Sequence, residues 1–317
     1  MKRFIIKATL LLVVFIGINL VLFFALPKND FDYLCEYNHK IQLLDTVSQP
    51  RIIFIGGSSV AFNNDSRMIL DSLGCHIINF GLHAGIGMRI PLEDALKYIR
   101  KGDIVVLQIE YTNFINGGNG EPETLPAFMV ATNWKSCRNL NFIQWQKLIQ
   151  GIPRENIRHV IQLFENPKGS LDAQNKNEDF VFVKGGFNEF GDEVSHLDYP
   201  NQKYIPSGMT FSSDIDPDFM KWLCCTLRLY EKAGAQIIMM PPACIESYFK
   251  EKYHHNIKDS LVKRGFPYIV EPSSMVVNDN CMFNSGYHFN SEGVRQNTAN
   301  IIRILKKSNV IHTPNTP

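Results

Sequence analysis

Several features that would assign a function directly are missing from this sequence. Its formal net charge is only +1, which argues against a nucleic-acid binder or a general binder of polyanions. No internal repeat or low-complexity tract is visible, so nothing indicates a repeat architecture. The seven cysteines form no Cys-x-x-Cys pair, so a zinc site is not indicated, and their odd number leaves at least one thiol unpaired within the chain.

The N-terminus carries the one long apolar run. Lys2, Arg3 and Lys7 precede an uncharged stretch from Ala8 to Leu26. At about 1.5 Å of rise per residue, this stretch nearly spans a hydrocarbon core of about 30 Å. Because the basic side chains lie on its N-terminal side, the positive-inside rule predicts a cytoplasmic N-terminus and an extracytoplasmic remainder.

A cleaved signal peptide is the alternative interpretation of this run. Its apolar region would be shorter, about 7–15 residues, and would end in an Ala-x-Ala pattern. No such pattern precedes Pro27. We therefore predict that residues 1–29 form a basic cytoplasmic end and a single-pass transmembrane anchor, although both interpretations export the domain.

Residues 30–317 alternate between strand and helix patterns. Apolar runs rich in β-branched residues predict strands at Arg51–Gly56, His76–Gly81, Asp103–Ile109, Ala235–Met240 and Phe266–Val270. Periodic segments predict helices at Ser58–Leu73, Arg89–Arg100, Phe142–Phe164, Asp218–Ala233, Cys244–Lys263 and Ser291–Lys307. Repeated strand–helix units predict a three-layer α/β/α domain with a parallel sheet, interrupted by a polar insertion at about 115–215.

In such sheets, functional sites lie beyond the carboxyl ends of the strands, so the residues that follow each strand matter most. Ser58 follows the first strand within Gly56-Gly57-Ser58-Ser59, where helix N-terminal amides can bind a developing oxyanion. The alternative is that this serine only caps the helix. Gly85 lies in the glycine-rich turn after the second strand, and Asn113 follows the third. Asn113 could donate its amide to an oxyanion or merely cap a loop.

A late histidine completes the set. His288 lies in the loop ahead of the C-terminal helix, from which it can reach back across the sheet edge to a serine. In that pairing the imidazole takes the hydroxyl proton.

Together these segments resemble the SGNH (GDSL-type) hydrolase family, in order and spacing, from about Arg51 to Leu305. The resemblance implies a flavodoxin-like sheet with Ser58 as nucleophile and first oxyanion donor, and with His288 as base. It implies Gly85 as the second oxyanion donor and Asn113 as the third. It is strongest to membrane-anchored, extracytoplasmic members that handle acyl groups on cell-envelope polymers.

The sequence departs from the family pattern at three places. Gly57 stands where aspartate is usual, and Tyr111 stands where the third block has glycine. Ser285 occupies the position of the triad aspartate, and Asn284 lies one residue earlier, where some relatives place that acid. Asparagine can hold an imidazole ring but supplies no negative charge. Asp279 would need a different loop path.

The expected activity is therefore that of an O-acyl esterase or acyltransferase, with acetyl the favoured acyl group. Its substrate would be an acylated carbohydrate or envelope polymer outside the membrane, with water or a sugar hydroxyl as acceptor. No metal, organic cofactor or nucleic acid is implied. The alternative is a catalytically impaired SGNH fold that binds glycans or assists envelope assembly. A nucleotide-binding protein is a weaker alternative, because the sequence has neither a G-x-G-x-x-G fingerprint nor a P-loop lysine.

Overall fold

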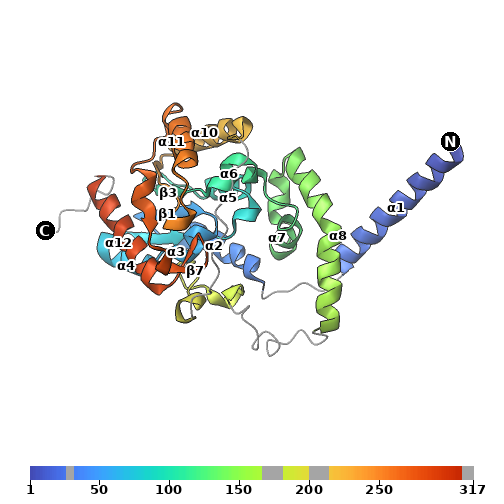
Figure 1. Cartoon of the computed structure of the whole chain (residues 1–317), viewed down its shortest axis with the longest axis horizontal. Coiled ribbons are helices and arrows are strands. Elements are labelled where there is room, and N and C mark those ends of the chain that lie inside the picture. Colours follow the sequence, from blue (N-terminus) through green and yellow to red (C-terminus); the bar gives the residue numbers. More distant parts are fainter. Residues whose placement is uncertain (26–31, 166–180, 200–213, 309–317) are drawn as a thin grey trace.

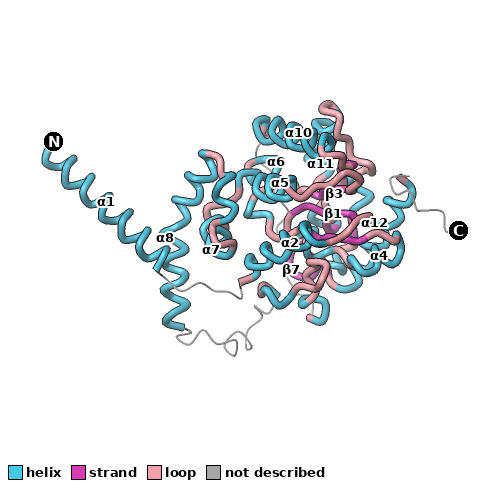
Figure 2. The backbone as a smooth tube through the Cα atoms, turned by 180° about the vertical axis from the view of Figure 1, so that it is seen from behind, coloured by secondary structure: helices cyan, strands magenta, loops and turns pink. Residues whose placement is uncertain are grey.

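The computed structural model describes residues 1–25, 32–165, 181–199 and 214–308. Its centre is a parallel sheet of four strands in the order β2-β1-β3-β4. These strands are β1 (Arg51–Gly56), β2 (His76–Asn79), β3 (Ile104–Gln108) and β4 (Gln236–Met239). Helices flank the sheet (Figures 1 and 2), so the predicted α/β class with a parallel sheet is confirmed.

Strand β1 is buried along its whole length, and its side chains alternate between two apolar clusters. Ile53 and Ile55 belong to the larger cluster, whereas Ile52 and Phe54 belong to the second. This alternation follows from the two-residue period of a strand. The larger cluster takes in residues of α2 (Glu36–Thr46), α5 (Arg89–Leu96), α7 (Leu125–Ala131) and α10 (Pro217–Lys232). The second takes in residues of α4 (Ser66–Leu73) and α12 (Ser291–Lys307).

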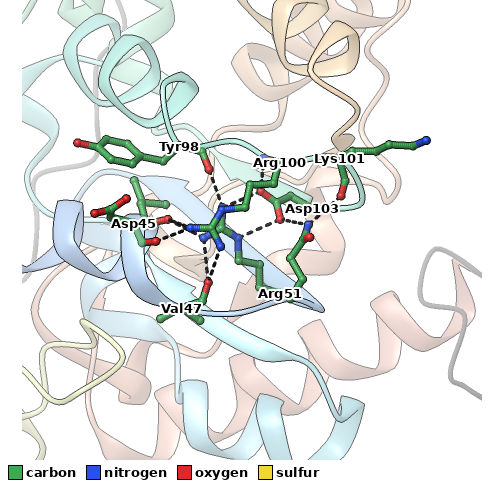
Figure 3. A network of polar contacts seen from close by, with 9 residues as sticks. Asp45, Val47, Arg51, Tyr98, Arg100, Lys101 and Asp103 are labelled. Carbon is green, nitrogen blue, oxygen red and sulfur yellow. Dashed lines mark hydrogen bonds and ion pairs between the residues drawn. The ribbon is translucent and has the colours of Figure 1, made fainter.

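A buried ion pair joins the beginnings of β1 and β3 (Figure 3). Arg51 Nε and Nη2 each lie 2.9 Å from a carboxylate oxygen of Asp103, and both side chains are fully buried. The guanidinium also donates to the carbonyls of Leu44 and Tyr98, at 2.6 Å each. The backbone N–H of Arg100 donates to Asp103 at 2.7 Å. The pair therefore ties the end of α2 and the loop before β3 to the central strand.

The segment 181–199 is held at the edge of β2 by buried polar contacts. The Asp192 carboxylate accepts hydrogen bonds from Ser66 Oγ at 2.6 Å and from Asn79 Nδ2 at 2.7 Å. Lys40 Nζ donates to the carbonyls of Asn79 and Gly191, and burial lowers the pKa of this lysine to about 8. This part of the predicted insertion is thus anchored to the sheet.

Helix α1 (Lys2–Ala25) is long and apolar enough to cross a membrane, and almost all of it is exposed. Its C-terminal part packs on α8 (Phe142–Glu165), where Asn156 Nδ2 donates to the carbonyl of Asn19 at 2.9 Å. The rest of α1 projects away from the domain beyond α8 (Figure 1).

Four of the predicted elements are wrong in part, and one of them is the helix expected at Arg89–Arg100, which ends at Leu96. The helix expected at Ser58–Leu73 is two helices, α3 (Ser58–Asn63) and α4, because the Asp65 carboxylate caps α4 through the Met68 N–H at 2.9 Å. The strand expected at 266–270 is reduced to a single bridge between Tyr268 and Met239. Pro267 has no N–H for a ladder.

The helix expected at Cys244–Lys263 begins later, as α11 (Glu251–Val262). Its expected first turn is instead a strand, β5 (Cys244–Ile245), which pairs with β6 (Val276–Val277). Long-range pairing has overridden the local helical pattern here. Cys224 is buried, and its neighbour Cys225 is exposed.

We predict that Asp103→Asn lowers the free energy of unfolding by about 3–5 kcal/mol, because it leaves the Arg51 guanidinium buried without its counter-charge. Urea unfolding of the full chain in detergent, followed by circular dichroism, measures the change. Glu189→Gln, which removes the exposed ion pair with Arg67, is the control and should leave the midpoint unchanged. A midpoint for Asp103→Asn equal to that of the control would contradict the prediction.

Candidate active site

Ser58 is the first residue of α3, two positions after β1 ends. The turn is tight and needs glycine at residue 56. A Cβ there would lie 2.4 Å from the Val60 side chain and 2.5 Å from the Gln108 carbonyl oxygen. Ser58 is half-buried, so its hydroxyl remains within reach of a ligand. The structure therefore places this serine at the carboxyl end of the central strand, as predicted.

His288 reaches Ser58 from a separate hairpin formed by β7 (Met282–Ser285) and β8 (His288–Phe289). His288 Nε2 lies 2.8 Å from Ser58 Oγ. Asn63 of α3 holds the hairpin in place, since its side chain donates to the Tyr287 carbonyl at 2.7 Å and accepts from the Phe289 N–H at 2.9 Å. The two predicted residues, 230 positions apart, thus meet at hydrogen-bond distance.

Phe62 orients the imidazole from one side. The rings of Phe62 and His288 are stacked, with centroids 4.1 Å apart and an interplanar angle of 10°. Because Phe62 lies one helical turn after Ser58, α3 supplies both the hydroxyl and the surface on which the base rests.

Asn284 occupies the position of the third group. Its Oδ1 lies 2.7 Å from His288 Nδ1. Because a carbonyl oxygen only accepts, this contact places the imidazole proton on Nδ1 and leaves Nε2 to accept from the Ser58 hydroxyl. Ser285 has a different partner, accepting from the Tyr287 N–H at 3.2 Å, and Asp279 is exposed and accepts from the Ser247 N–H at 2.8 Å.

The surroundings of His288 disfavour its charged form. Burial lowers the pKa of His288 to about 3, and the nearby His196 and His83 contribute to this lowering by repulsion. Among the described residues, the two ring nitrogens contact the neutral amide of Asn284 and the Ser58 hydroxyl, so neither contact supplies a negative charge to offset these effects. The imidazole is therefore neutral over the ordinary pH range and is a weak base.

Glu110 is a site residue that the sequence analysis missed. Its Oε1 accepts from the Ser59 N–H at 2.9 Å and lies 3.5 Å from Ser58 Oγ. The carboxyl group is buried, and burial raises its pKa. The signal was present in the sequence, because β1 and β3 end in register and Glu110 follows β3 as Ser58 follows β1.

The Glu110 carboxylate occupies the space that a side chain on residue 57 would need. Gly57 is the N-cap of α3 and has no side chain with which to accept an amide proton, so the Glu110 carboxylate accepts the Ser59 N–H instead. A Cβ on residue 57 would lie 2.5 Å from Glu110 Oε1. The glycine that departs from the SGNH pattern is thus matched by a carboxylate from the next strand.

The structure does not bring the other two predicted residues into direct contact with the serine. Gly85 donates its N–H to His83 Nδ1 at 3.0 Å. Asn113 is buried in α6 (Tyr111–Ile115), and neither polar atom of its side chain has a hydrogen-bond partner in the described part of the chain. Their oxyanion roles stay predictions.

Among the described residues, no group of three or more histidine, cysteine, aspartate and glutamate side chains is arranged to hold a metal ion. Comparison with known proteins adds no relative, since no family model, curated sequence or solved structure matches this chain. Any assignment of this site therefore depends on its own geometry.

We predict that Gly57→Asp destabilises the protein and that Glu110→Ala rescues it. The backbone at Gly57 has φ −85°, which aspartate can adopt, so the main obstacle is the Glu110 carboxylate, with Ala84 Cβ next at 3.1 Å from the added Cβ. The clash should cost about 1–3 kcal/mol, and the double variant should recover most of it because the introduced aspartate then caps α3.

A double-mutant cycle of unfolding free energies measures this coupling. Glu292→Ala, at an exposed position of α12, is the control second-site change and should give no rescue. Additive effects of Gly57→Asp and Glu110→Ala would show that the two positions do not compete for space.

We predict that Asn284→Asp raises the pKa of His288, because a carboxylate beside Nδ1 favours the imidazolium. The acid limb of kcat/KM should then move upward from a pH near 3, and turnover at neutral pH should rise by about tenfold or more. Asn284→Ala is the matched control. It should lower turnover without moving the acid limb of kcat/KM to higher pH. An unchanged pH profile for Asn284→Asp would show that Asn284 does not set the state of the ring.

Proposed function

We propose that this protein is a serine-dependent O-acyl esterase or acyltransferase of the SGNH type, anchored in a membrane with its globular domain outside. The observation that carries the proposal is the chain of contacts from Ser58 through His288 to Asn284, at 2.8 and 2.7 Å. A hydroxyl, an imidazole and an orienting group in this order form the general arrangement for activating a serine.

In the proposed reaction, Ser58 Oγ attacks the acyl carbonyl carbon while its proton passes to His288 Nε2. The tetrahedral intermediate collapses when the carbon–oxygen bond to the alcohol breaks and His288 returns the proton to the leaving oxygen. Water or a sugar hydroxyl then attacks the acyl-serine, with the same base taking its proton, and Ser58 is regenerated. The Ser58 amide, with Gly85 and Asn113, would hold the oxyanion.

Gly85 must change partner to take that part, because its N–H donates to His83 in the structure. Burial lowers the pKa of His83, which favours the neutral ring whose Nδ1 accepts the amide proton. Asn113 would not need to change partner. Its buried side-chain amide has no hydrogen-bond partner among the described residues, so it could donate to a ligand without breaking an existing hydrogen bond.

The sheet supports the finer fold assignment, a three-layer α/β/α domain of SGNH kind. Its strand order β2-β1-β3-β4 agrees with the flavodoxin-like order, and β1 faces one apolar cluster on each side. The site lies beyond the carboxyl ends of β1 and β3, where ligands bind in such sheets.

Membrane anchoring and substrate class rest on α1 and on the family resemblance. The three basic residues before the apolar run favour a cytoplasmic N-terminus, which would place the site on the outer side. An acylated carbohydrate or envelope polymer, with acetyl as the acyl group, is the substrate class that this setting and the resemblance favour. A lid or polymer-binding face at Asn166–Gly208, which the sequence allows, falls largely outside the described residues.

A second function, a glycan-binding or assembly component without turnover, is favoured by one observation. Asn284 supplies no charge to the imidazolium, and burial holds the pKa of His288 at about 3. In serine proteases, replacing the triad aspartate by asparagine costs about 10⁴ in kcat. The two functions therefore differ in whether Ser58 is reactive at all.

We predict that a fluorophosphonate labels the full-length protein in detergent and that Ser58→Ala and His288→Ala each abolish the labelling. Release of acetate from an acetylated glycan should fall by about 10³-fold or more in both variants. Ser59→Ala is the matched control, because it removes the buried hydroxyl next to Ser58 while the contact between Ser58 and His288 stays in place, and it should label normally.

Absence of labelling in a folded wild type would favour the binding function. Labelling that survives Ser58→Ala would show that another residue reacts. Adding a sugar acceptor to the acetate-release assay separates the two reactions, since an acyltransferase transfers the acetyl group to the sugar and an esterase releases it to water.

A further inference from the structure

One face of α8 is apolar and exposed. The large side chains on this face include Phe142, Trp145, Ile149, Ile157, Ile161 and Phe164, which are 75%, 39%, 60%, 61%, 48% and 83% exposed. At about 100° per residue, their spacing places them on one side of the helix. Other positions, such as Leu148 and Ile152, are buried against the domain. Gln146 and Gln150 are exposed within the same arc, so the surface is amphipathic, and large exposed apolar side chains of this kind mark a binding surface.

This face lies beside α1. Asn156 of α8 donates from Nδ2 both to the carbonyl and to the side-chain oxygen of Asn19, at 2.9 and 3.1 Å. Near the end of α1, Phe23 and Phe24 contact the Trp134 ring, with centroids 5.4 and 5.3 Å apart. In both views α8 separates α1 from the sheet (Figures 1 and 2).

We propose that α8 lies in the outer interface of the lipid bilayer that α1 crosses, with its exposed apolar face against the acyl chains. The proposal rests on the membrane anchoring proposed above. The same acyl chains that would cover the exposed side chains of α1, such as Leu10 and Val14, would continue over Ile149 and Ile157.

The depth of the contact agrees with this placement. Asn19 lies six residues before Ala25, the last residue of α1, which is about 9 Å along the helix axis. Interfacial helices typically bury their apolar face by about 5–10 Å. A helix bonded to Asn19 therefore lies at the depth expected for the boundary between headgroups and acyl chains.

Charge at the border of the face fits the same occupant. Arg154 and Arg158 are one turn apart beside the apolar side chains, and their side chains are 73% and 44% exposed. They pair with Glu123 and Glu155 and lie where lipid phosphates would be. A second copy of the chain is the competing occupant of this face. A second copy that covered α8 alone would leave the exposed apolar side chains of α1 in contact with water, whereas a bilayer covers both helices.

Tryptophan quenching by brominated lipid tests the proposal on the full chain reconstituted in phosphatidylcholine vesicles. The chain has three tryptophans, so Trp134→Phe with Trp222→Phe leaves Trp145 on α8 as the only fluorophore. Trp134→Phe with Trp145→Phe leaves Trp222 on α10 and is the matched control. Lipid brominated at carbons 6 and 7 should quench Trp145 at least about twofold more than Trp222.

Each outcome decides a different question. Flotation of the protein with the vesicles shows that the anchor is inserted. If the protein floats but brominated lipid quenches Trp145 and Trp222 equally weakly, the α8 proposal is overturned and the anchor stands. Loss of flotation would overturn the anchor itself. If brominated lipid does not quench Trp145, and acrylamide quenches it less as the protein concentration rises, then a second copy covers α8. That result would also overturn the proposal. Ile149→Lys with Ile157→Lys should reduce the quenching of Trp145 while flotation persists.

Discussion

The pairing of β1 with β3 is the constraint on which the rest of the structure depends. At one end of this pair, Arg51 and Asp103 form the buried ion pair, and at the other end Ser58 lies beside Glu110. Both contacts join residues 52 positions apart, because both follow the same register. A slip of one residue would exchange the side chains that β1 presents to its two apolar clusters, separate the buried charges and move the serine away from its neighbours. The ion pair and the site therefore lie at opposite ends of the same pair of strands.

His288 is held firmly in place at the site, but little in its surroundings stabilises its charged form. Stacking on Phe62 and the bond to Asn284 fix the plane and tautomer of His288, while burial and the neighbouring histidines oppose its charging. A triad aspartate would offset that opposition with its charge. This chain instead has its buried carboxylate at Glu110, against the serine end of the pair, where it caps α3. The geometry of an activated serine is therefore present while the charge that normally supports it lies elsewhere.

The segment between α6 and α10 contributes elements both to the site and to the contact with α1. One part of it, 181–199, packs against the site, where the His196 ring contacts Phe62 and Phe283 with centroids 4.9 and 5.3 Å apart. Another part forms α7 and α8, and α8 carries the contact with α1. Elements added between two strands of a sheet are free to take on such tasks because they do not alter the strand pairing. With the proposed anchoring, they would place Ser58 at a set distance from the bilayer.

The sequence by itself determined the anchor-like helix, the parallel α/β sheet, the place of Ser58 after a strand and the choice of His288 as its partner, because apolar periodicity and residues after strands are local signals. Strand β1 and helix α12 have the predicted ends. Only the tertiary structure decided that Asn284 rather than Ser285 or Asp279 faces the imidazole, since this depends on the path of the β7–β8 hairpin. It also decided that Glu110 caps α3 and that β5 replaces a helical turn. Each of these depends on contacts between residues far apart in the chain, whose energies no local pattern records.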